Sequence, residues 1–254
     1  MAVIKTGKGR LNSRTAFFSN KIQNRARFTD SYIYRDTPRR MKLRLPLTCL
    51  ATTCLLAAPI AAQAGDLTVT VTDTAGKPVA SAVIAFKPAA GGALSSADRQ
   101  GPFVLAQKNI KFNPFVLAVP VGSTVNFPNQ DRVNHHVYSF SAVQPFQFPL
   151  YGQGQTRSLR FDHPGTVAIA CNIHDSMSAY VRVVDTPYYA TTDATGRVTL
   201  KDLPETAGTL SVWQPLMDAP EHSAVRTTTP GKGSSTQTFT VKIRAAAMPA
   251  SSAY

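Results

Sequence analysis

Three residues in the second half of the chain have types and spacing that suit a soft metal ion. Cys171, His174 and Met177 follow one another at three-residue intervals, directly after the apolar run of residues 167–170. A thiolate, an imidazole and a thioether on one loop are the kinds of ligand that copper prefers. Taken singly, the cysteine could be a small buried side chain or a reactive thiol, and the methionine an ordinary core residue. The combined pattern favours a copper site.

A copper site of this kind needs a second imidazole from a distant part of the chain. His135 and His136 lie upstream, where one strand-like run ends and another begins, and two strands of one sandwich can bring such a histidine to the Cys171 loop. Adjacent residues of a strand point to opposite sides, so only one of the two can bind the metal. His163 lies in a turn and His222 in a polar loop, and we interpret both as solvent-exposed.

Other metal centres fit the sequence less well. Zinc is the metal alternative, but zinc sites more usually recruit further cysteine or histidine than a thioether. A c-type haem is excluded because the chain has no Cys-x-x-Cys-His sequence. After the leader described below, Cys171 is the one remaining cysteine, which disfavours a two-copper cluster. No second copper site with several histidines is visible, which disfavours an enzyme.

The charge of the chain is concentrated at its start. The 254 residues have a formal net charge of +13, and residues 1–40 contain ten Lys or Arg and two Asp or Glu. Residues 65–254 contain 15 basic and 12 acidic residues, a net charge of +3. A surface so balanced does not neutralise phosphates, so we do not expect the protein to bind nucleic acid.

Residues 41–64 have the organisation of a secretory signal peptide. Met41–Arg44 is positively charged, residues 45–61 are apolar, and Ala62–Ala64 is a small-x-small cleavage site. A transmembrane anchor is the alternative, but the apolar run contains two prolines and is barely long enough to span. We expect an exported, periplasmic chain without a stable membrane span, and we interpret residues 1–40 as an upstream extension from a misassigned start.

The chain after the leader is predicted to be all-β. Residues 67–72 and 179–184 alternate apolar and polar side chains, and other strand-like runs, including residues 104–112, are separated by turns. No stretch shows sustained helical periodicity. Many short strands with regular turns predict a β-sandwich or barrel. Residues 245–254 are expected to form a flexible tail.

The segment from residue 119 to residue 184 resembles the cupredoxins, the blue-copper protein family of plastocyanin and azurin. Its Pro-Gly turn, strand and Cys-x-x-His-x-x-Met loop have the short spacing of amicyanin. Most of residues 66–220 also resembles bacterial cupredoxin-containing proteins labelled methylamine utilization proteins. The strings that carry these resemblances are Val121–Phe127, His135–Ser141, Cys171–Met177 and Thr186–Gly196.

The resemblance implies a cupredoxin Greek-key β-sandwich with one type-1 copper ion. His135, Cys171 and His174 would be its strong ligands and Met177 its weak axial ligand. This ligand set suits both oxidation states of copper, so little reorganisation accompanies electron transfer. His174 would lie at the surface in an apolar patch, to which residues 146–151 could contribute unless they belong to the core.

Two positions depart from the usual cupredoxin sequence. His136 stands where the family has an asparagine after the first histidine ligand, and Asn172 follows the cysteine, where the family has Ser or Thr nearby. We predict that the side chains of His136 and Asn172 pair behind the ligands and fix the loop. Ser176 stands where the related proteins generally have tryptophan, which predicts a more exposed copper loop.

Residues on both sides of the cupredoxin-like segment resemble the two halves of a carboxypeptidase-regulatory-like β-sandwich. We expect residues 65–98 and 186–244 to form these halves, with the cupredoxin domain of residues 99–185 inserted in or flanked by them. The rival arrangement is two loosely associated segments. Similar Asp-x-x-Gly sequences at residues 73–76 and 193–196 are predicted hairpin turns. This second module has no cluster of potential catalytic groups and is expected to be structural or to dock partners.

The predicted function is that of an exported type-1 copper protein that is not an enzyme. It would carry single electrons between periplasmic redox partners such as a c-type cytochrome or a dehydrogenase. One alternative is a periplasmic copper-handling protein that binds and delivers the metal without cycling it. Another is an envelope interaction module with a non-redox site.

Overall fold

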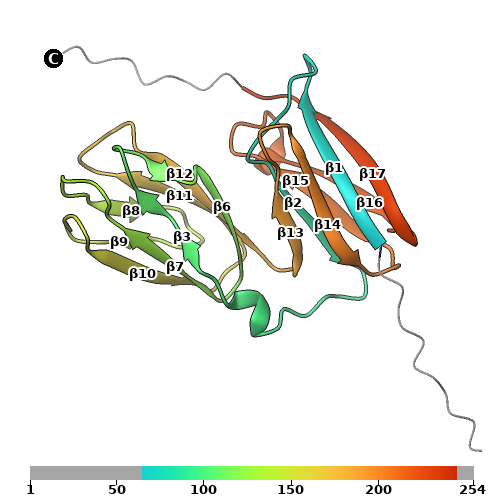
Figure 1. The fold of residues 1–254 in the computed structure, drawn as a ribbon, viewed down its shortest axis with the longest axis horizontal. Coiled ribbons are helices and arrows are strands. Elements are labelled where there is room, and N and C mark those ends of the chain that lie inside the picture. The colour runs from blue at the N-terminus through green and yellow to red at the C-terminus, as the bar shows by residue number, and fades with distance from the viewer. Residues whose placement is uncertain (1–64, 245–254) are drawn as a thin grey trace, which may run out of the picture. The chain divides into compact units, whose positions relative to one another are not determined.

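The computed structural model describes residues 65–244 (Figure 1). The predicted upstream extension of residues 1–40, signal peptide of residues 41–64 and tail of residues 245–254 lie outside the described residues. Within the described part, the regular structure is strand apart from two three-residue 3-10 turns. The prediction of an all-β protein is therefore confirmed. The described residues contain no helix whose length and apolar character would let it cross a membrane.

The strands from β3 to β12 form one β-sandwich. Its sheets have the strand orders β6-β12-β11-β8-β9, β10-β7-β3 and β4-β5. The pairings β12–β6 and β3–β7 are parallel, and the others in these sheets are antiparallel. The elements are η1 (Ala97–Arg99), β3 (Phe103–Val104), β4 (Ala106–Gln107), β5 (Phe112–Asn113), β6 (Val116–Pro120), β7 (Ser123–Pro128), β8 (Val137–Ser139), β9 (Phe146–Gln147), β10 (Thr156–Phe161), β11 (Gly165–Cys171) and β12 (Ser178–Val184).

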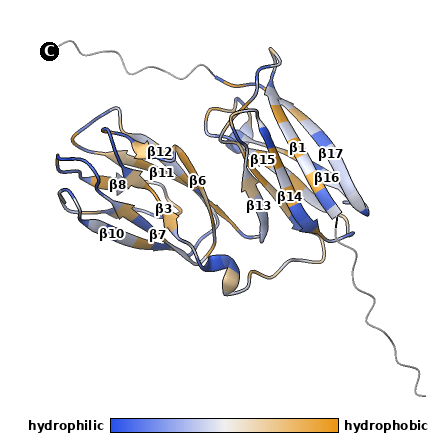
Figure 2. Cartoon of the chain, viewed as in Figure 1, coloured by the Kyte–Doolittle hydropathy of each residue, from blue (hydrophilic) through white to orange (hydrophobic). Residues whose placement is uncertain are grey.

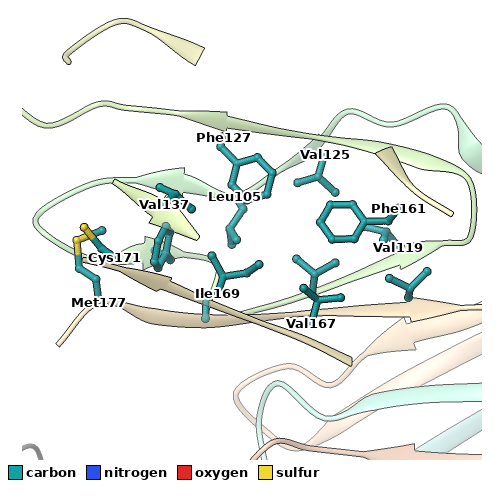
Figure 3. Packing of buried hydrophobic residues seen from close by; sticks show 14 of the residues in the cluster. Leu105, Val119, Val125, Phe127, Val137, Phe161, Val167, Ile169, Cys171 and Met177 are labelled. Carbon is teal, nitrogen blue, oxygen red and sulfur yellow. The ribbon is translucent and has the colours of Figure 1, made fainter. Parts of the chain in front are cut away.

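An apolar core lies between the two larger sheets of this sandwich (Figure 3). Val125 and Phe127 point inward from β7, and Val167 and Ile169 point inward from β11, because side chains two residues apart on a strand share a face. Cys171 continues the β11 series and is only 3% exposed. The alternation that builds the core therefore also turns the thiol inward, at the last residue of the strand.

The predicted strand over residues 104–112 is interrupted by a turn. Lys108 and Lys111 bond to each other through their backbones, N–H to carbonyl at 2.9 and 3.2 Å. Between them, Asn109 and Ile110 have φ angles of 57° and 54°. The amides of these two residues are held by a carboxylate from another loop. A tertiary contact of this kind is not visible in the local pattern of apolar residues.

The remaining strands form a second β-sandwich. Its sheets have the orders β14-β1-β17 and β13-β2-β15-β16, so strands from the start of the described chain pair with strands from its end. β1 is parallel to β17 and antiparallel to β14. The elements are β1 (Gly65–Asp73), β2 (Val83–Pro88), β13 (Tyr188–Thr191), β14 (Arg197–Leu203), β15 (Gly208–Trp213), η2 (Pro220–His222), β16 (Ser223–Thr228) and β17 (Gly233–Val241).

The second sandwich has its own apolar core. Leu67, Val69 and Val71 of β1 are buried in it and alternate with half-buried residues. The hydropathy colouring of β1 in Figure 2 alternates along the strand in the same way. Phe86 of β2 and Leu210 of β15 pack in the same cluster. Burial of each such side chain contributes roughly 1.5–3 kcal/mol, so each sandwich has a hydrophobic basis for folding.

The two predicted Asp-x-x-Gly turns have the same structure. Oδ1 of Asp73 accepts the amides of residues 75 and 77, both at 2.8 Å. Oδ1 of Asp193 accepts the amides of residues 195 and 197 at 2.8 and 3.1 Å. Gly76 and Gly196 have φ angles of 81° and 72°, a conformation that glycine adopts without steric cost. Both predicted turns are therefore present, although each connects strands of two different sheets rather than the two strands of a hairpin.

Candidate metal centre

The cysteine of the predicted site ends β11, and a short loop returns the chain to β12. The N–H of Met177 donates to the carbonyl of His174 at 2.9 Å, and the N–H of Cys171 donates to the carbonyl of Met177 at 3.3 Å. These bonds close the loop, so that three side chains are presented from one turn. Met177 is buried in the same core cluster as Cys171, and Figure 3 shows the two sulfur-bearing side chains beside each other.

His135 reaches the site from a different segment, immediately before β8. Its backbone forms an antiparallel bridge with Tyr151, N–H to carbonyl at 3.1 Å in both directions. β8 pairs with β11 so that Val137 lies opposite Cys171. This register brings the imidazole of His135 to the cysteine, and His135 is 0% exposed. Burial raises the pKa of Tyr151 well above its usual value, which keeps this neighbouring phenol neutral.

Three donor atoms converge at this point of the sandwich. The Sγ of Cys171 lies 3.7 Å from Nδ1 of His135 and 3.8 Å from Nδ1 of His174. The donor atoms of all three residues lie within 4.8 Å of one another. In the part of the chain that the structure describes, no other three or more His, Cys, Asp or Glu side chains converge in this way.

These distances fit a single metal ion between the three donors. A metal bonded to sulfur at about 2.3 Å and to nitrogen at about 2.0 Å, with an angle of about 120° between the bonds, separates the two donors by about 3.7 Å. The donor types fit as well, since two imidazoles and a thiolate with a thioether nearby form trigonal copper sites. The structure thus gathers three of the four predicted ligands and buries Met177 in the same core cluster as the cysteine.

A carboxylate that was not predicted contacts the buried imidazole. Oδ2 of Asp131 lies 3.0 Å from Nε2 of His135, the ring nitrogen that does not face the cysteine. The backbone amides of Asn109 and Ile110 donate to the same carboxylate at 2.6 and 3.1 Å. Burial by itself raises the pKa of Asp131, but these three hydrogen bonds outweigh it and hold the pKa below its usual value. The clue in the sequence is an aspartate four residues before the histidine.

The predicted contact between His136 and Asn172 takes a different form. The N–H of Asn172 donates to the backbone carbonyl of His136 at 3.0 Å, while Nε2 of the His136 imidazole lies 2.8 Å from Nε2 of Gln147. Among residues 65–244 no hydrogen bond joins the side chains of His136 and Asn172. The two strands already hold these residues together through the backbone, which leaves the imidazole free to pair with β9.

A surface position was also considered for His163, His222 and residues 146–151. His163 is exposed and His222 is half-buried, and neither belongs to the donor cluster. Within residues 146–151, Phe146 and Phe148 pack against Phe127, with ring centroids 5.9 and 5.4 Å away. That segment is therefore divided: its aromatic side chains pack on the core, whereas Gln147, Pro149 and Leu150 are exposed, Leu150 to 56%.

Several solved structures are similar to part of the chain, whereas no protein-family model and no curated protein matches it. A copper-containing nitrite reductase from Thermus scotoductus SA-01 is 29% identical over 39% of this chain and 25% of that chain, with a TM-score of 0.33. The purple cupredoxin from Nitrosopumilus maritimus is 23% identical over 32% of this chain and 99% of that chain, with a TM-score of 0.30. A reduced, Cu(I) form of an amicyanin variant is 25% identical over 40% of this chain and 98% of that chain, with a TM-score of 0.32. The chain thus covers only a quarter of the nitrite reductase.

The architecture agrees with the predicted fold class. The described chain is all-β, and the sandwich of β3 to β12 is consistent with a cupredoxin-like β-sandwich. The narrower likeness to methylamine utilization proteins stays a prediction. The carboxypeptidase-regulatory-like character of the second sandwich also stays a prediction, as do the domain boundaries.

Proposed function

We propose that the protein binds one copper ion through His135, Cys171, His174 and Met177 and uses it to carry single electrons. The observation that supports this most directly is the convergence of one sulfur and two imidazole nitrogens within 4.8 Å of one another. When bound, copper supplies the change between Cu(I) and Cu(II). The side chains of this protein supply the binding, the orientation and the exclusion of water.

The scaffold favours a site that does not rearrange between oxidation states. Cys171 is fixed at the end of a core strand, and His135 is held by its bridge to Tyr151. Both ligand side chains are buried, so water is kept from the metal. A site whose ligand distances are already set needs little reorganisation when it gains or loses an electron.

His174 is the ligand through which we propose that electrons enter and leave. It is half-buried, whereas the other three proposed ligands are buried. Ile173, its neighbour in the loop, is 48% exposed and offers an apolar contact to a partner. We propose a redox protein such as a c-type cytochrome or a dehydrogenase as this partner, in the periplasm, where the predicted signal peptide would direct the chain.

We also propose that the second sandwich is a separate module without a metal site. Its sheets are supported by pairing between residues 65–88 and residues 188–241. The residues between these segments form the sandwich of β3 to β12. This pattern supports the predicted insertion of the cupredoxin domain of residues 99–185 between residues 65–98 and residues 186–244.

The test is the visible spectrum of the purified protein loaded with Cu(II), beside Cys171→Ala, His174→Ala and His163→Ala. We expect an intense thiolate–copper band that bleaches with ascorbate and returns on oxidation. The band should vanish in Cys171→Ala and change or vanish in His174→Ala. His163→Ala is the matched control, because this exposed histidine lies outside the cluster and its loss should leave the band unchanged.

A colourless Cu(II)-loaded protein would contradict the proposed electron carrier. If such a protein still bound Cu(I) tightly and lost that affinity in Cys171→Ala, the copper-handling alternative would replace it. If it bound neither oxidation state, the envelope interaction module would remain.

A further inference from the structure

The imidazole of His135 lies between a thiol and a carboxylate. Its Nδ1 is 3.7 Å from Sγ of Cys171, and its Nε2 is 3.0 Å from Oδ2 of Asp131. The side chain of His135 is 0% exposed and that of Asp131 is 11% exposed. Water therefore competes little for the second nitrogen, and the carboxylate is its hydrogen-bond partner.

The carboxylate of Asp131 is itself held in place by the turn between β4 and β5. Oδ1 accepts the amide of Asn109 and Oδ2 that of Ile110. The φ angles of 57° and 54° at these residues are uncommon for non-glycine residues, above all for a β-branched one. Strained conformations persist where the surrounding structure fixes them. Here the unusual backbone conformation directs the N–H groups of both residues toward the carboxylate of Asp131.

A second brace acts on the loop that carries Asp131. The backbone N–H of Asp131 donates to Oδ1 of Asn129 at 2.8 Å. Nδ2 of Asn129 donates to the carbonyls of Val133 and Tyr151 at 2.8 and 3.0 Å. Asn129 is 1% exposed, and Tyr151 is the bridge partner of His135. One buried amide thus ties the carboxylate, its loop and the backbone of the histidine together.

A neutral imidazole has one N–H group, and an ionised carboxylate can only accept a hydrogen bond. Facing Asp131, Nε2 must therefore carry the proton. Nδ1 is then left with its lone pair directed at the cysteine side, where a metal ion would be bound. The tautomer that binds metal is the one that the carboxylate selects.

We propose that Asp131 is a positioning residue for His135: it fixes the Nε2–H tautomer before metal binds and places a negative charge behind the ligand. This proposal rests on the proposed copper site for its consequence, but the tautomer itself is a property of the metal-free protein. A negative charge behind the ligand stabilises Cu(II) more than Cu(I). Asp131 therefore lowers the reduction potential of the site and tightens Cu(II) binding in particular.

The first measurement is the nitrogen-15 NMR spectrum of the histidine rings in metal-free protein, at a pH where imidazole is neutral. We expect His135 to show a protonated Nε2 and an unprotonated Nδ1. In Asp131→Ala, which removes the acceptor, the two tautomers should mix. A protonated Nδ1 or a mixture of tautomers in the unmodified protein would overturn the proposal, and that result does not depend on whether any variant folds.

The second measurement separates the charge of Asp131 from its shape. Asp131→Asn keeps the size of the side chain and removes the charge, and we expect Cu(II) affinity to fall by about 10- to 100-fold. Cu(I) affinity should fall less, so the reduction potential should rise. Asp162→Asn is the matched control, since Asp162 is exposed and paired with Arg160. If Asp131→Asn changed the Cu(II) and Cu(I) affinities by no more than Asp162→Asn does, the proposal would be wrong.

The two proposals fail in different ways. A protein with the expected tautomer that bound no copper would contradict the proposed function and leave the role of Asp131 in orienting the imidazole intact. A protein with a blue copper band and a mixture of His135 tautomers would support the proposed function and contradict the proposed role of Asp131.

Discussion

The two sandwiches of this protein have apolar cores of the same kind, but the loop aspartates compared below accept hydrogen bonds from different parts of the chain. In the second sandwich, Asp73 and Asp193 accept amides of their own turns. In the sandwich of β3 to β12, Asp131 and Asn129 bond to segments far away in the sequence. The bonds of Asp73 and Asp193 stay within their own turns, whereas Asp131 also contacts the imidazole of His135, which faces the thiol of Cys171.

The largest expected difference between the two sandwiches is in copper binding, which should be lost in Cys171→Ala. Removal of the sulfur eliminates the thiolate ligand, and copper affinity should fall by at least the roughly 10- to 100-fold effect seen when a mere supporting residue of a metal site is lost. The matched change in the second sandwich is Met217→Ala, which removes a buried sulfur-containing side chain with no donor cluster around it. It should destabilise the fold and leave copper binding unchanged, as measured by competition with a chelator. Equal copper affinities for the two variants would contradict the site.

The next largest effect tests whether the two cores are independent. Phe127→Ala and Phe86→Ala each empty a fully buried position, one in each sandwich, and each should cost about 3–5 kcal/mol of unfolding free energy. The thermal loss of the copper band should move to lower temperature in Phe127→Ala only. Calorimetry alongside the band distinguishes the two transitions. A band that melted equally early in Phe86→Ala would show that the cores unfold together.

A smaller effect distinguishes the two similar turns from each other. Alanine at either glycine must adopt a left-handed conformation, which costs about 1–2 kcal/mol. A Cβ at Gly76 meets nothing within 4 Å, whereas one at Gly196 would approach the carbonyl oxygen of Val71 to 2.4 Å. Gly196→Ala should therefore destabilise the protein more than Gly76→Ala in chemical denaturation. A smaller destabilisation by Gly196→Ala than by Gly76→Ala would contradict the predicted clash with the carbonyl oxygen of Val71.

The smallest expected effect is the pH dependence that comes from one turn. The hydroxyl of Thr195 and then the amide of Arg197 hold the pKa of Asp193 below its usual value. Because the folded pKa is the lower one, the stabilisation is present above the unfolded value of about 3.9 and is lost as pH falls through the folded pKa. Asp193→Asn should flatten the unfolding free energy against pH in this acid range. Thr195→Val should give an intermediate slope, and an unchanged slope in both variants would contradict the assignment.

The sequence predicted best what depends on neighbouring residues. The alternation in β1 and β12 predicted both strands, and the repeated Asp-x-x-Gly sequence predicted two turns of one kind. The spacing of Cys171, His174 and Met177 predicted that one loop presents all three, which it does because a hairpin closes between β11 and β12. Each of these features is encoded within a few residues.

Apart from the approach of His135 to the Cys171 loop and the pairing of the two halves of the second sandwich, contacts between distant segments were not predicted. The position of Asp131 four residues before His135 is a weak signal in the sequence, and its partners at Asn109 and Ile110 come from an earlier turn. The same turn split the strand predicted over residues 104–112. Gln147 was not expected to contact His136, because the short β9 that carries it has no alternating pattern of its own.

The parallel pairing of β1 with β17 has a consequence for the order of folding. β1 lies at the start of the described chain, and its register with β17 runs from Gly65 with Gly233 to Asp73 with Val241. Pairing of such high sequence separation requires loop closure over nearly all of the described residues and is slow. During synthesis from the N-terminus, every strand of the β3 to β12 sandwich is made before β17 exists. The edge of β1 that pairs with β17 therefore stays unpaired until β17 has been made. The sandwich of β3 to β12 can fold before that.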